Sequence, residues 1–453
     1  MPWKHWDSKY MNIREAQQYK ERLAAAGMKP GLERMSVLCS KLGNPQNGLN
    51  FIHVAGTNGK GSVCAFISSI LDEAGYKVGR YTSPAVIEDR ERYRIGGRNV
   101  SQSAYCRNLE EVKAAADMMV LEGGEENEPT LFEVETALAF MIFAEAGCDI
   151  VVLECGMGGA GDATNIIHAP AVSVITRVSL DHTRYLGRTV DAIAREKVGI
   201  IKKGTNVVTI SQTPEVISVI KAKASLEKAP LTIADPAGIK NAKAGLKTTT
   251  FDYGRYKGLK ISLIGSWQIE NAIVAISAVE SLRKVRIRID EKSIKEGLLK
   301  AVWPGRFEII SHNPTVIIDG AHNENAAKRL SKTVEYFFHN EEEAGKLIFI
   351  MGVLGDKNYP AICEYMAPHA AHVITLTPDN PRALPAQELA ETVKKYNDMV
   401  SVATSPDEAL EMAYLLADKD SVIIAFGSLS FLGAIRTLTD SKGAALKKKQ
   451  IVP

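Results

Sequence analysis

The feature that most constrains the fold is a regular alternation of strand-like and helix-like runs along most of the 453 residues. Short, apolar, β-branched runs such as residues 51–57 and 149–155 alternate with longer helix-like runs such as residues 131–146. Alternation of this kind is typical of βαβ units, in which helices cover both faces of a mostly parallel sheet. The pattern therefore predicts an α/β protein.

This alternation is interrupted once, in the segment VWPGRFE at residues 302–308. Pro304 and Gly305 are strong turn signals there, and a second alternating series follows them. A chain of this length is long enough for two or three domains. We therefore predict a domain boundary near residue 298.

Composition excludes several classes of protein. Hydrophobic residues make up 45% of the chain and charged residues 24%, which is the ordinary balance of a globular protein. The net charge of +2 gives no overall field that would hold nucleic acid or an anionic membrane. Neither a membrane-spanning run nor the apolar core of a signal peptide is visible, so we expect a cytoplasmic protein.

The cysteines are scattered, without the spacing of a zinc site. In a cytoplasmic chain of this length we expect them to be small buried hydrophobic residues rather than members of a disulfide framework. They are Cys39, Cys64, Cys106, Cys148, Cys155 and Cys363.

The run HVAGTNGKGS at residues 53–62 lies between a predicted strand and a predicted helix, which is the context that a phosphate-binding loop requires. Glycines let backbone N–H groups turn inward, and the start of the helix adds partial positive charge. Lys60 is placed to reach the β- and γ-phosphates. Gly61 intervenes before Ser62, which makes that serine a weaker magnesium ligand than its counterpart in GxxxxGK[ST]. The alternative is a plain glycine-rich turn, against which the lysine argues.

A second glycine-rich run, GMGGAG at residues 156–161, matches the fingerprint of dinucleotide-binding oxidoreductases. Asp181 lies about where the ribose-binding acid of such a protein would be. However, the short run DATNIIHAP, which ends in Pro170, is all that separates Gly161 from the next strand. It is too short for a crossover helix of normal length, so the spacing argues against a dinucleotide site.

Glu154 ends the apolar run VVLE beside the predicted phosphate strand. A buried carboxylate is costly unless it is paired or bound to a metal. An acid at the carboxyl end of a strand near a phosphate loop is where nucleotide-bound magnesium is held. We therefore predict that Glu154 binds Mg²⁺, with an ion pair to a neighbouring arginine as the alternative.

Taken together, several motifs in this order and spacing resemble one family: GTNGKGS, YTSP, LECGMGG..DATN, SLDHTRYLG, REKVGIIK, WPGRFE and IIDGAHN. The chain resembles the folylpolyglutamate synthases and bifunctional dihydrofolate synthase/folylpolyglutamate synthases of the Mur-ligase superfamily, over residues 10–435. The resemblance implies a P-loop-type ATP-binding domain, residues 1–297, and a smaller Rossmann-like glutamate-ligase domain, residues 298–453. It implies that ATP activates the carboxylate of a folate or dihydropteroate as an acyl phosphate, which L-glutamate attacks. We expect a monomer.

The resemblance also assigns residues of the first domain. The catalytic residues are Lys60, Glu154, His182 and Lys197, the last of them carbamylated by carbon dioxide. The magnesium ligands, for two ions, are Ser83, Glu154 and His182, and a potassium ion is a further expected cofactor. The phosphates lie on Thr57, Asn58, Gly59, Lys60, Gly61 and Ser62. From the residues alone, the alternatives are a buried core histidine for His182 and a solvated surface lysine for Lys197.

Other residues are assigned to the substrates in the same way. Asn271, Arg306 and Asp319 match nucleotide contacts, and His322 and Ser428 are candidate glutamate contacts. The pterin side matches Thr130, Leu131, Phe132, Glu133, Gly161, Asp162 and Ala163. Here the chain has Ala160 and Gly161 where the commoner family pattern has Arg-Leu, so a cation is missing beside the acceptor loop.

Three alternative functions remain open. The chain could be a ligase of this family that acts on a different acid, for which the missing arginine is the only support. It could be a P-loop kinase or nucleoside triphosphatase, against which the second domain with IIDGAHN argues. It could also be an inactive binding module, against which the joint presence of the catalytic residues argues.

Overall fold

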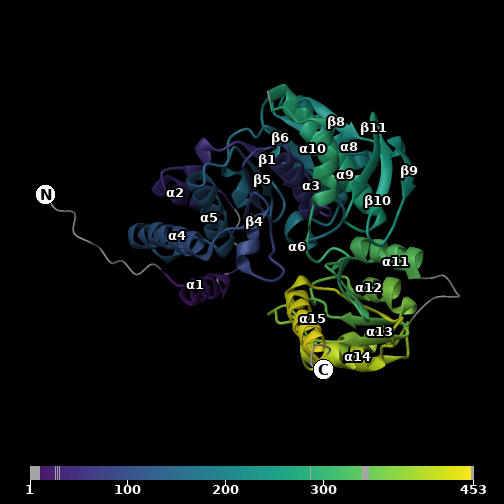
Figure 1. Cartoon of the computed structure of the whole chain (residues 1–453). Helices are drawn as coiled ribbons and strands as arrows, with labels where there is room; N and C mark the ends of the chain where they lie inside the picture. The colour runs from purple at the N-terminus through teal and green to yellow at the C-terminus, as the bar shows by residue number, and fades with distance from the viewer. Residues whose placement is uncertain are drawn as a thin grey trace. The chain divides into compact units, whose positions relative to one another are not determined.

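The structure is a computed structural model, and it describes residues 11–25, 27, 29, 31–285, 287–338 and 346–449. The chain forms two compact units (Figure 1). The first unit comprises residues up to 83, 90–236 and 273–297, and the second comprises residues 84–89, 237–272 and those from 298 onward.

Among the described residues, eight strands form the sheet of the first unit, in the order β4-β3-β2-β5-β1-β6-β7-β8. The six strands from β2 to β8 in this order are parallel, whereas β3 and β4 are antiparallel at one edge. The strands are β1 (Phe51–Ala55), β2 (Val78–Tyr81), β3 (Tyr93–Ile95), β4 (Arg98–Asn99), β5 (Ile150–Glu154), β6 (Val172–Ile175), β7 (Asn206–Ile210) and β8 (Leu231–Ala234).

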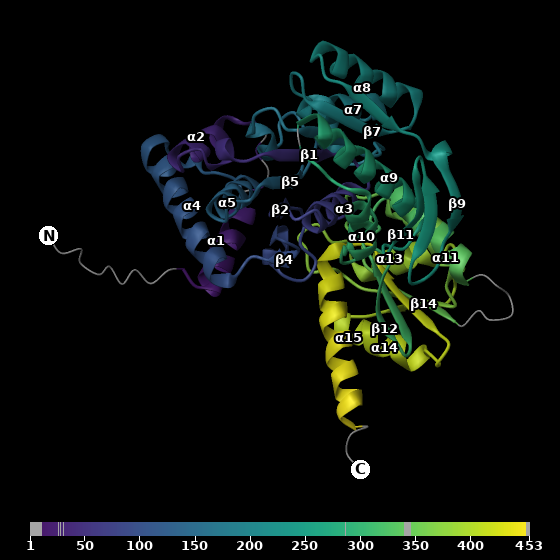
Figure 2. The ribbon, with the colours of Figure 1, turned by 45° about the horizontal axis from the view of Figure 1, so that its top comes forward.

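Helices cover both faces of this sheet, which is why every residue of β1 and β5 is buried. On one side α1 (Ile13–Ala25), α2 (Glu33–Lys41), α4 (Gln102–Gly123) and α5 (Leu131–Glu145) pack together (Figures 1 and 2). Helix α3 (Lys60–Glu73) packs on β1, β2 and β5. The remaining helices are α6 (Thr183–Leu186), α7 (Val190–Lys197), α8 (Pro214–Leu226), α9 (Ser266–Ser281) and α10 (Glu291–Lys300), of which α9 and α10 contribute to both units.

The second unit has a sheet in the order β12-β13-β17-β14-β15-β16, in which β12 alone among the described strands is antiparallel. Its strands are β12 (Glu308–His312), β13 (Thr315–Asp319), β14 (Leu347–Met351), β15 (His372–Thr375), β16 (Val400–Val402) and β17 (Val422–Phe426). Its helices are α11 (Glu324–Phe338), α12 (Tyr359–Met366), α13 (Ala386–Val393), α14 (Pro406–Leu416) and α15 (Leu429–Lys449), the long helix seen in Figure 2.

This unit also carries a small antiparallel sheet made of β9 (Ile239–Lys243), β10 (Thr249–Tyr253) and β11 (Tyr256–Ile261). Strands β10 and β11 form a hairpin whose turn contains Gly254, with a φ of 54°. Because only glycine adopts such a left-handed conformation at no steric cost, the predicted turn at this residue is explained.

The predicted α/β class, with one large and one smaller parallel-rich sheet, is confirmed. The cysteines are also as expected, since all of them are free and buried. One strand is shorter than the sequence predicts: the apolar run suggests a strand over residues 171–181, but β6 ends at Ile175. Beyond it, the Arg177 carbonyl accepts hydrogen bonds from the Thr57 and Asn58 N–H groups, so this residue pairs with the loop after β1 and not with a strand.

Candidate active site

The predicted phosphate loop joins the carboxyl end of β1 to the start of α3, as the sequence indicates. Gly59 precedes the helix with a φ of 90°, and Gly56 has a φ of 151°. A Cβ atom on Gly56 would lie 1.8 Å from the Thr176 Oγ1 atom, so the loop cannot accommodate a larger residue there. Glycine therefore serves both the turn and the close approach of β1 to the end of β6.

Two backbone amides of this loop are directed into the protein. The Thr57 and Asn58 N–H groups donate to the Arg177 carbonyl at 2.8 and 3.2 Å. The Ser179 N–H group donates to the Thr57 hydroxyl, which in turn donates to the Ser179 carbonyl. Donors for a phosphate group are then the first N–H groups of α3 and its N-cap, which no helical carbonyl satisfies.

Two lysines converge on a single carbonyl of the loop. Lys60 Nζ donates to the Gly56 carbonyl at 3.1 Å, and Lys197 Nζ donates to the same oxygen at 2.9 Å. Lys197 ends α7, a helix whose predicted N-cap, Thr189, accepts a hydrogen bond from the Ala192 N–H group. The two lysine amines therefore meet at the Gly56 carbonyl of the phosphate loop.

Lys197 is only 4% exposed, so the alternative of a solvated surface lysine is wrong. Burial, followed by the positive charge of Lys60, lowers the pKa of Lys197 to about 7. Both effects disfavour the ammonium form. A large fraction of this side chain is therefore a neutral amine near neutral pH.

Glu154 and Ser83 come together at the carboxyl ends of neighbouring strands. Glu154 closes β5 and is 4% exposed, and Ser83 lies two residues after β2. The Ser83 N–H group donates to Glu154 Oε2 at 3.3 Å. The charges of Glu154 and the buried Arg80 on β2 also interact, so an arginine neighbour and a metal-binding role are both compatible with this carboxylate.

His182 lies on the irregular segment after β6, directly before α6, and has a left-handed φ of 50°. Its N–H group donates to Asp181 Oδ1 at 2.8 Å, and its side chain is half-buried rather than a core histidine. Within the described part of the chain, no three His, Cys, Asp or Glu side chains are grouped closely enough to hold a metal ion by themselves.

The predicted pterin-side residues at the start of α5 have structural partners. Thr130 and Glu133 form a capping box, in which each side chain accepts a hydrogen bond from the other's backbone N–H group. Glu133 also pairs with Arg34 of α2 at 3.2 Å. The Phe132 ring lies against Gly156, where a Cβ atom would approach it to 2.5 Å. Leu131, the first residue of α5, is partly buried.

The glycine-rich run after β5 is a loop and not the start of a helix. It ends in a single 3-10 turn, η4 (Ala163–Ile166), which confirms that no dinucleotide crossover follows it. A Cβ atom on Gly159 would lie 2.7 Å from the backbone carbonyl oxygens of both Glu196 and Lys197. Ala160 and Gly161 are exposed at the tip, whereas Asp162 is buried.

In the second unit, Asp319 ends β13 and is 4% exposed. Its carboxylate accepts hydrogen bonds from the Phe307 and Ala321 N–H groups at 2.7 and 2.8 Å. Burial raises the pKa of Asp319, while the charge of Arg306 opposes that effect. A Cβ atom on Gly320 would lie 1.8 Å from the Arg306 Nη1 atom, so the guanidinium rests directly on this glycine.

His322 joins this group, because its Nδ1 atom lies 2.7 Å from the Gly320 carbonyl oxygen. Ser428 follows β17, the neighbour of β13, and its hydroxyl lies 2.8 Å from that of Ser430. The second unit thus gathers Arg306, Asp319 and His322. Asn271 lies on α9, where its amide donates to the Gln268 side chain at 2.9 Å.

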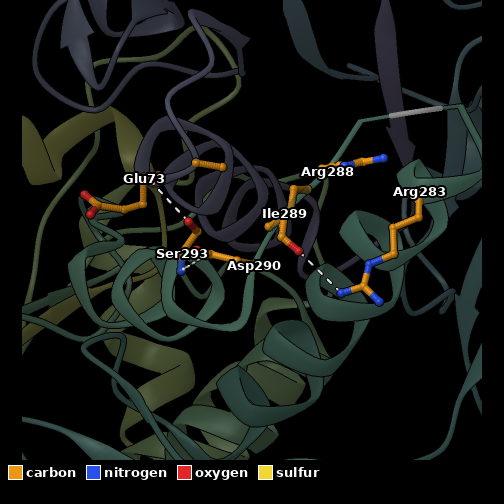
Figure 3. A pocket seen from close by; sticks show the side chains of 7 residues that line it. Glu73, Arg283, Arg288, Ile289, Asp290 and Ser293 are labelled. Carbon is orange, nitrogen blue, oxygen red and sulfur yellow. Dashed lines mark hydrogen bonds between the residues drawn. The ribbon is translucent and has the colours of Figure 1, made fainter.

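A pocket of about 860 Å³ lies elsewhere in the first unit, and none of its lining residues was predicted as a site residue. It lies between the end of α3 and the start of α10, lined by Glu73, Ala74, Arg283, Arg288, Ile289, Asp290 and Ser293. Figure 3 shows Glu73, Arg283 and Arg288 extending in different directions. Asp290 accepts a hydrogen bond from Ser293 N–H at 2.7 Å, which caps α10. Because this pocket contains none of the predicted site residues, we place the candidate site at the phosphate loop instead.

Three residues with structural links to the site were not predicted: Arg34, His53 and Thr164. Of these, only Thr164 lies inside a family motif named above, DATN, and His53 lies in the predicted strand that precedes GTNGKGS. No helix in the described part of the chain is long and apolar enough to cross a membrane.

Comparison with known proteins gives matches along nearly the whole chain. Residues 54–279 match the Mur ligase middle domain, and residues 305–429 match the Mur ligase glutamate ligase domain. The dihydrofolate synthase/folylpolyglutamate synthase of Bacillus subtilis is 37% identical over 90% of this chain and 95% of its own length.

Solved structures with a similar fold come from the same family of enzymes. Folylpolyglutamate synthase of Mycobacterium tuberculosis, complexed with ADP and AMPPCP, is 31% identical with a TM-score of 0.86, covering 93% of this chain and 98% of that one. FolC of Escherichia coli, in complex with DHPP and ADP, is 29% identical with a TM-score of 0.83, covering 96% and 99%. The chain therefore belongs to the folylpolyglutamate synthase and dihydrofolate synthase family of Mur ligases.

Proposed function

We propose that the protein is an ATP-dependent ligase that joins L-glutamate to the carboxylate of a folate. A carboxylate oxygen of the acceptor attacks the γ-phosphorus of ATP, and ADP leaves. The amine of glutamate then attacks the resulting acyl phosphate, phosphate leaves with its C–O bond broken, and the amine loses its proton. The convergence of Lys60 and Lys197 on the Gly56 carbonyl, at a glycine-rich strand-to-helix loop, carries this proposal.

ATP fits the loop by its chemistry. The N-cap and first turn of α3 supply N–H groups and partial positive charge at Gly59, Lys60, Gly61 and Ser62. Thr57 and Asn58 hold the loop through residues 177 and 179, and Lys60 supplies charge to the transferring phosphoryl group. Relatives whose solved structures contain ADP or AMPPCP support the same assignment.

Magnesium fits the donors at the strand ends. Mg²⁺ usually takes one or two carboxylates and fills its other positions with water and substrate phosphate. Glu154 is such a carboxylate, and Ser83 lies against it. We assign His182 as a third ligand by resemblance alone. Bound there, Mg²⁺ would neutralise charge on the phosphates. Two magnesium ions and a potassium ion remain predictions.

Carbamylation of Lys197 fits its burial. The neutral amine attacks the carbon of carbon dioxide, an N–C bond forms as one C=O π bond breaks, and one proton is released, so that the neutral amine becomes an anionic carbamate. An amine with a pKa of about 7 supplies the neutral form that this step needs. We propose that the carbamate orients the acyl phosphate or a magnesium ion.

We further propose that residues 1–297 act as the P-loop-type ATP-binding domain and residues 298–453 as the Rossmann-like glutamate-ligase domain. The second-unit residues Asn271, Arg306 and Asp319 would contact the nucleotide, and His322 and Ser428 would contact glutamate. We propose a cytoplasmic monomer with small-molecule substrates and no nucleic-acid or membrane partner.

The acceptor side is assigned to the start of α5 and to residues 161–163. Dihydropteroate is a second candidate acceptor, because relatives that match nearly the whole chain are named dihydrofolate synthase/folylpolyglutamate synthase. The exposed Ala160 is the one observation that favours a different acid, since this tip of the loop lacks a cation.

The test is a ligation assay with ATP, magnesium, L-glutamate and either tetrahydrofolate or dihydropteroate, read by product mass and ADP release. A gain of one glutamate mass on tetrahydrofolate supports the proposal, and a gain on both acceptors adds the dihydrofolate synthase activity. Release of ADP that does not require glutamate would favour a kinase or nucleoside triphosphatase instead. No mass gain on either acceptor would contradict the folate assignment.

A further inference from the structure

A row of buried polar side chains links β1 to the glycine-rich loop of residues 156–163, which is called the acceptor loop below. His53, in the middle of β1, is fully buried, and its Nε2 atom lies 2.8 Å from the Thr164 hydroxyl oxygen. The Thr164 hydroxyl donates a short hydrogen bond to Asp162 Oδ1. The Cys155 Sγ atom lies 3.0 Å from the same imidazole nitrogen. All four side chains belong to the first unit.

The donor and the acceptor of each hydrogen bond in this row of side chains follow from the number of protons that each group carries. A hydroxyl has one proton, and Thr164 gives its proton to the Asp162 carboxylate. The Thr164 oxygen must then accept from His53, so the imidazole proton is on Nε2. Nδ1 has no hydrogen-bond partner among the described residues, which makes a doubly protonated ring costly. Burial accordingly lowers the pKa of His53 to about 3 and keeps the ring neutral.

Asp162 connects this row of side chains to the acceptor loop. Its Oδ1 atom also accepts from the Thr164 N–H group at 3.0 Å, and its Oδ2 atom accepts from the Met157 N–H group at 2.8 Å. The carboxylate thereby fixes both ends of the turn that presents Ala160 and Gly161 to solvent. A rotation of this carboxylate would change the shape of the turn.

The geometry points to His53 and Thr164 as positioning residues for the acceptor: they hold Asp162, and through it the loop of residues 156–163, in the conformation that binds the folate or pteroate. This inference rests on the proposed function. It adds residues that contact neither ATP nor the acceptor in that proposal.

The position of His53 explains why such a link is useful. Strand β1 continues directly into the phosphate loop at Gly56, three residues beyond His53. One strand therefore carries the nucleotide loop at its end and anchors the acceptor loop from its middle. Ligation requires the acceptor carboxylate to lie in line with the γ-phosphate, and small displacements are costly to such a reaction.

Matched substitutions at Thr164 test the inference. Thr164→Val keeps the shape of the side chain but removes the hydroxyl, and Thr164→Ser keeps the hydroxyl. Since a hydrogen bond to a charged group is worth roughly 1.5–3 kcal/mol, we expect Thr164→Val to raise the acceptor KM and Kd about tenfold or more. ATP binding should stay within about twofold, and Thr164→Ser should stay within about threefold of the unaltered enzyme for both substrates.

A second pair at His53 keeps the test valid if Thr164→Val folds poorly. His53→Gln places an amide N–H donor near the imidazole Nε2 position, whereas His53→Leu removes the donor. We expect Gln to retain acceptor affinity better than Leu by about tenfold. Acceptor Kd is measured by titration and the folded state by circular dichroism, so a loss of affinity is separated from a loss of fold.

An unchanged acceptor KM in Thr164→Val would overturn the inference, and so would equal losses of ATP and acceptor binding in both Thr164 variants. If the unaltered enzyme ligates glutamate to tetrahydrofolate, only the positioning role is in question. If the unaltered enzyme neither binds nor ligates a folate or pteroate, the proposed function itself is overturned, and this inference with it.

Discussion

At the scale of single residues, Lys197 lies in an environment that is unusual for a lysine. It ends an amphipathic helix, yet its amine lies under the phosphate loop and donates to the Gly56 carbonyl at 2.9 Å. Burial beside Lys60 favours the neutral amine. If that amine becomes a carbamate during catalysis, its removal should abolish ligation while the fold persists.

We therefore predict that Lys197→Met lowers kcat by at least about a hundredfold, because the proposed carbamate is lost together with the amine. Bicarbonate should raise the rate of the unaltered enzyme in buffer depleted of carbon dioxide, and it should leave the variant unchanged. The control is Lys203→Met at an exposed lysine nearby. A variant of Lys197 that keeps most of its activity would contradict the role.

His53 gives a prediction about stability and pH. Its pKa is about 3 in the folded protein and near 6.5 in an unfolded chain, so between these values the unfolded state binds an extra proton. The contribution of the neutral His53 to the free energy of unfolding is therefore complete above about pH 6.5, and it is lost as pH falls towards 3. Between about pH 7.5 and about pH 5, the free energy of unfolding should fall by about 2 kcal/mol from this residue.

Urea unfolding at both pH values measures this loss. His53→Gln cannot take up the proton, so its free energy of unfolding should depend less on pH over the same interval. The same pH dependence in the variant and the unaltered protein would show that His53 is not the group responsible.

At the scale of elements, the glycine-rich loop after β5 packs on the end of α7 by backbone contact. A methyl group on Gly159 would lie 2.7 Å from the carbonyl oxygens of Glu196 and Lys197. We predict that Gly159→Ala displaces the end of α7, lowers stability by about 1–3 kcal/mol and lowers kcat, because Lys197 moves with the helix.

The matched control for this substitution is Gly48→Ala. A methyl group added at Gly48 would meet no atom of the described residues within 4 Å, and Gly48 needs no left-handed φ. Thermal unfolding and the ligation rate compare the two variants. Equal effects of both would mean that the contact between the loop and α7 is unimportant.

The sequence predicts some of these elements better than others. The strand–loop–helix unit at residues 51–73 is local, so apolar runs and glycines are enough to predict it. The burial of Lys197 depends on a contact with Gly56, far away in the chain, which helical periodicity cannot reveal. The inward direction of the Thr57 and Asn58 amides depends in the same way on Arg177.

At the scale of the whole molecule, two sheets carry the predicted residues at the carboxyl ends of their strands. Ser83, Glu154 and the phosphate loop follow β2, β5 and β1, which are neighbours in the first sheet. Asp319 ends β13 and Ser428 follows β17, and these two strands are neighbours in the second sheet. Carboxyl ends of parallel strands are where α/β proteins bind ligands, so fold and motif agree in each unit.

The molecule as a whole is proposed to activate a carboxylate as an acyl phosphate. The most direct measurement labels the acceptor carboxylate of tetrahydrofolate with ¹⁸O, runs the ligation with ATP and L-glutamate, and determines the mass of the released phosphate. Because a carboxylate oxygen attacks the γ-phosphorus and later leaves with it, one labelled oxygen should appear in each phosphate. Phosphate that carries no label, formed together with the glutamate product, would contradict the account.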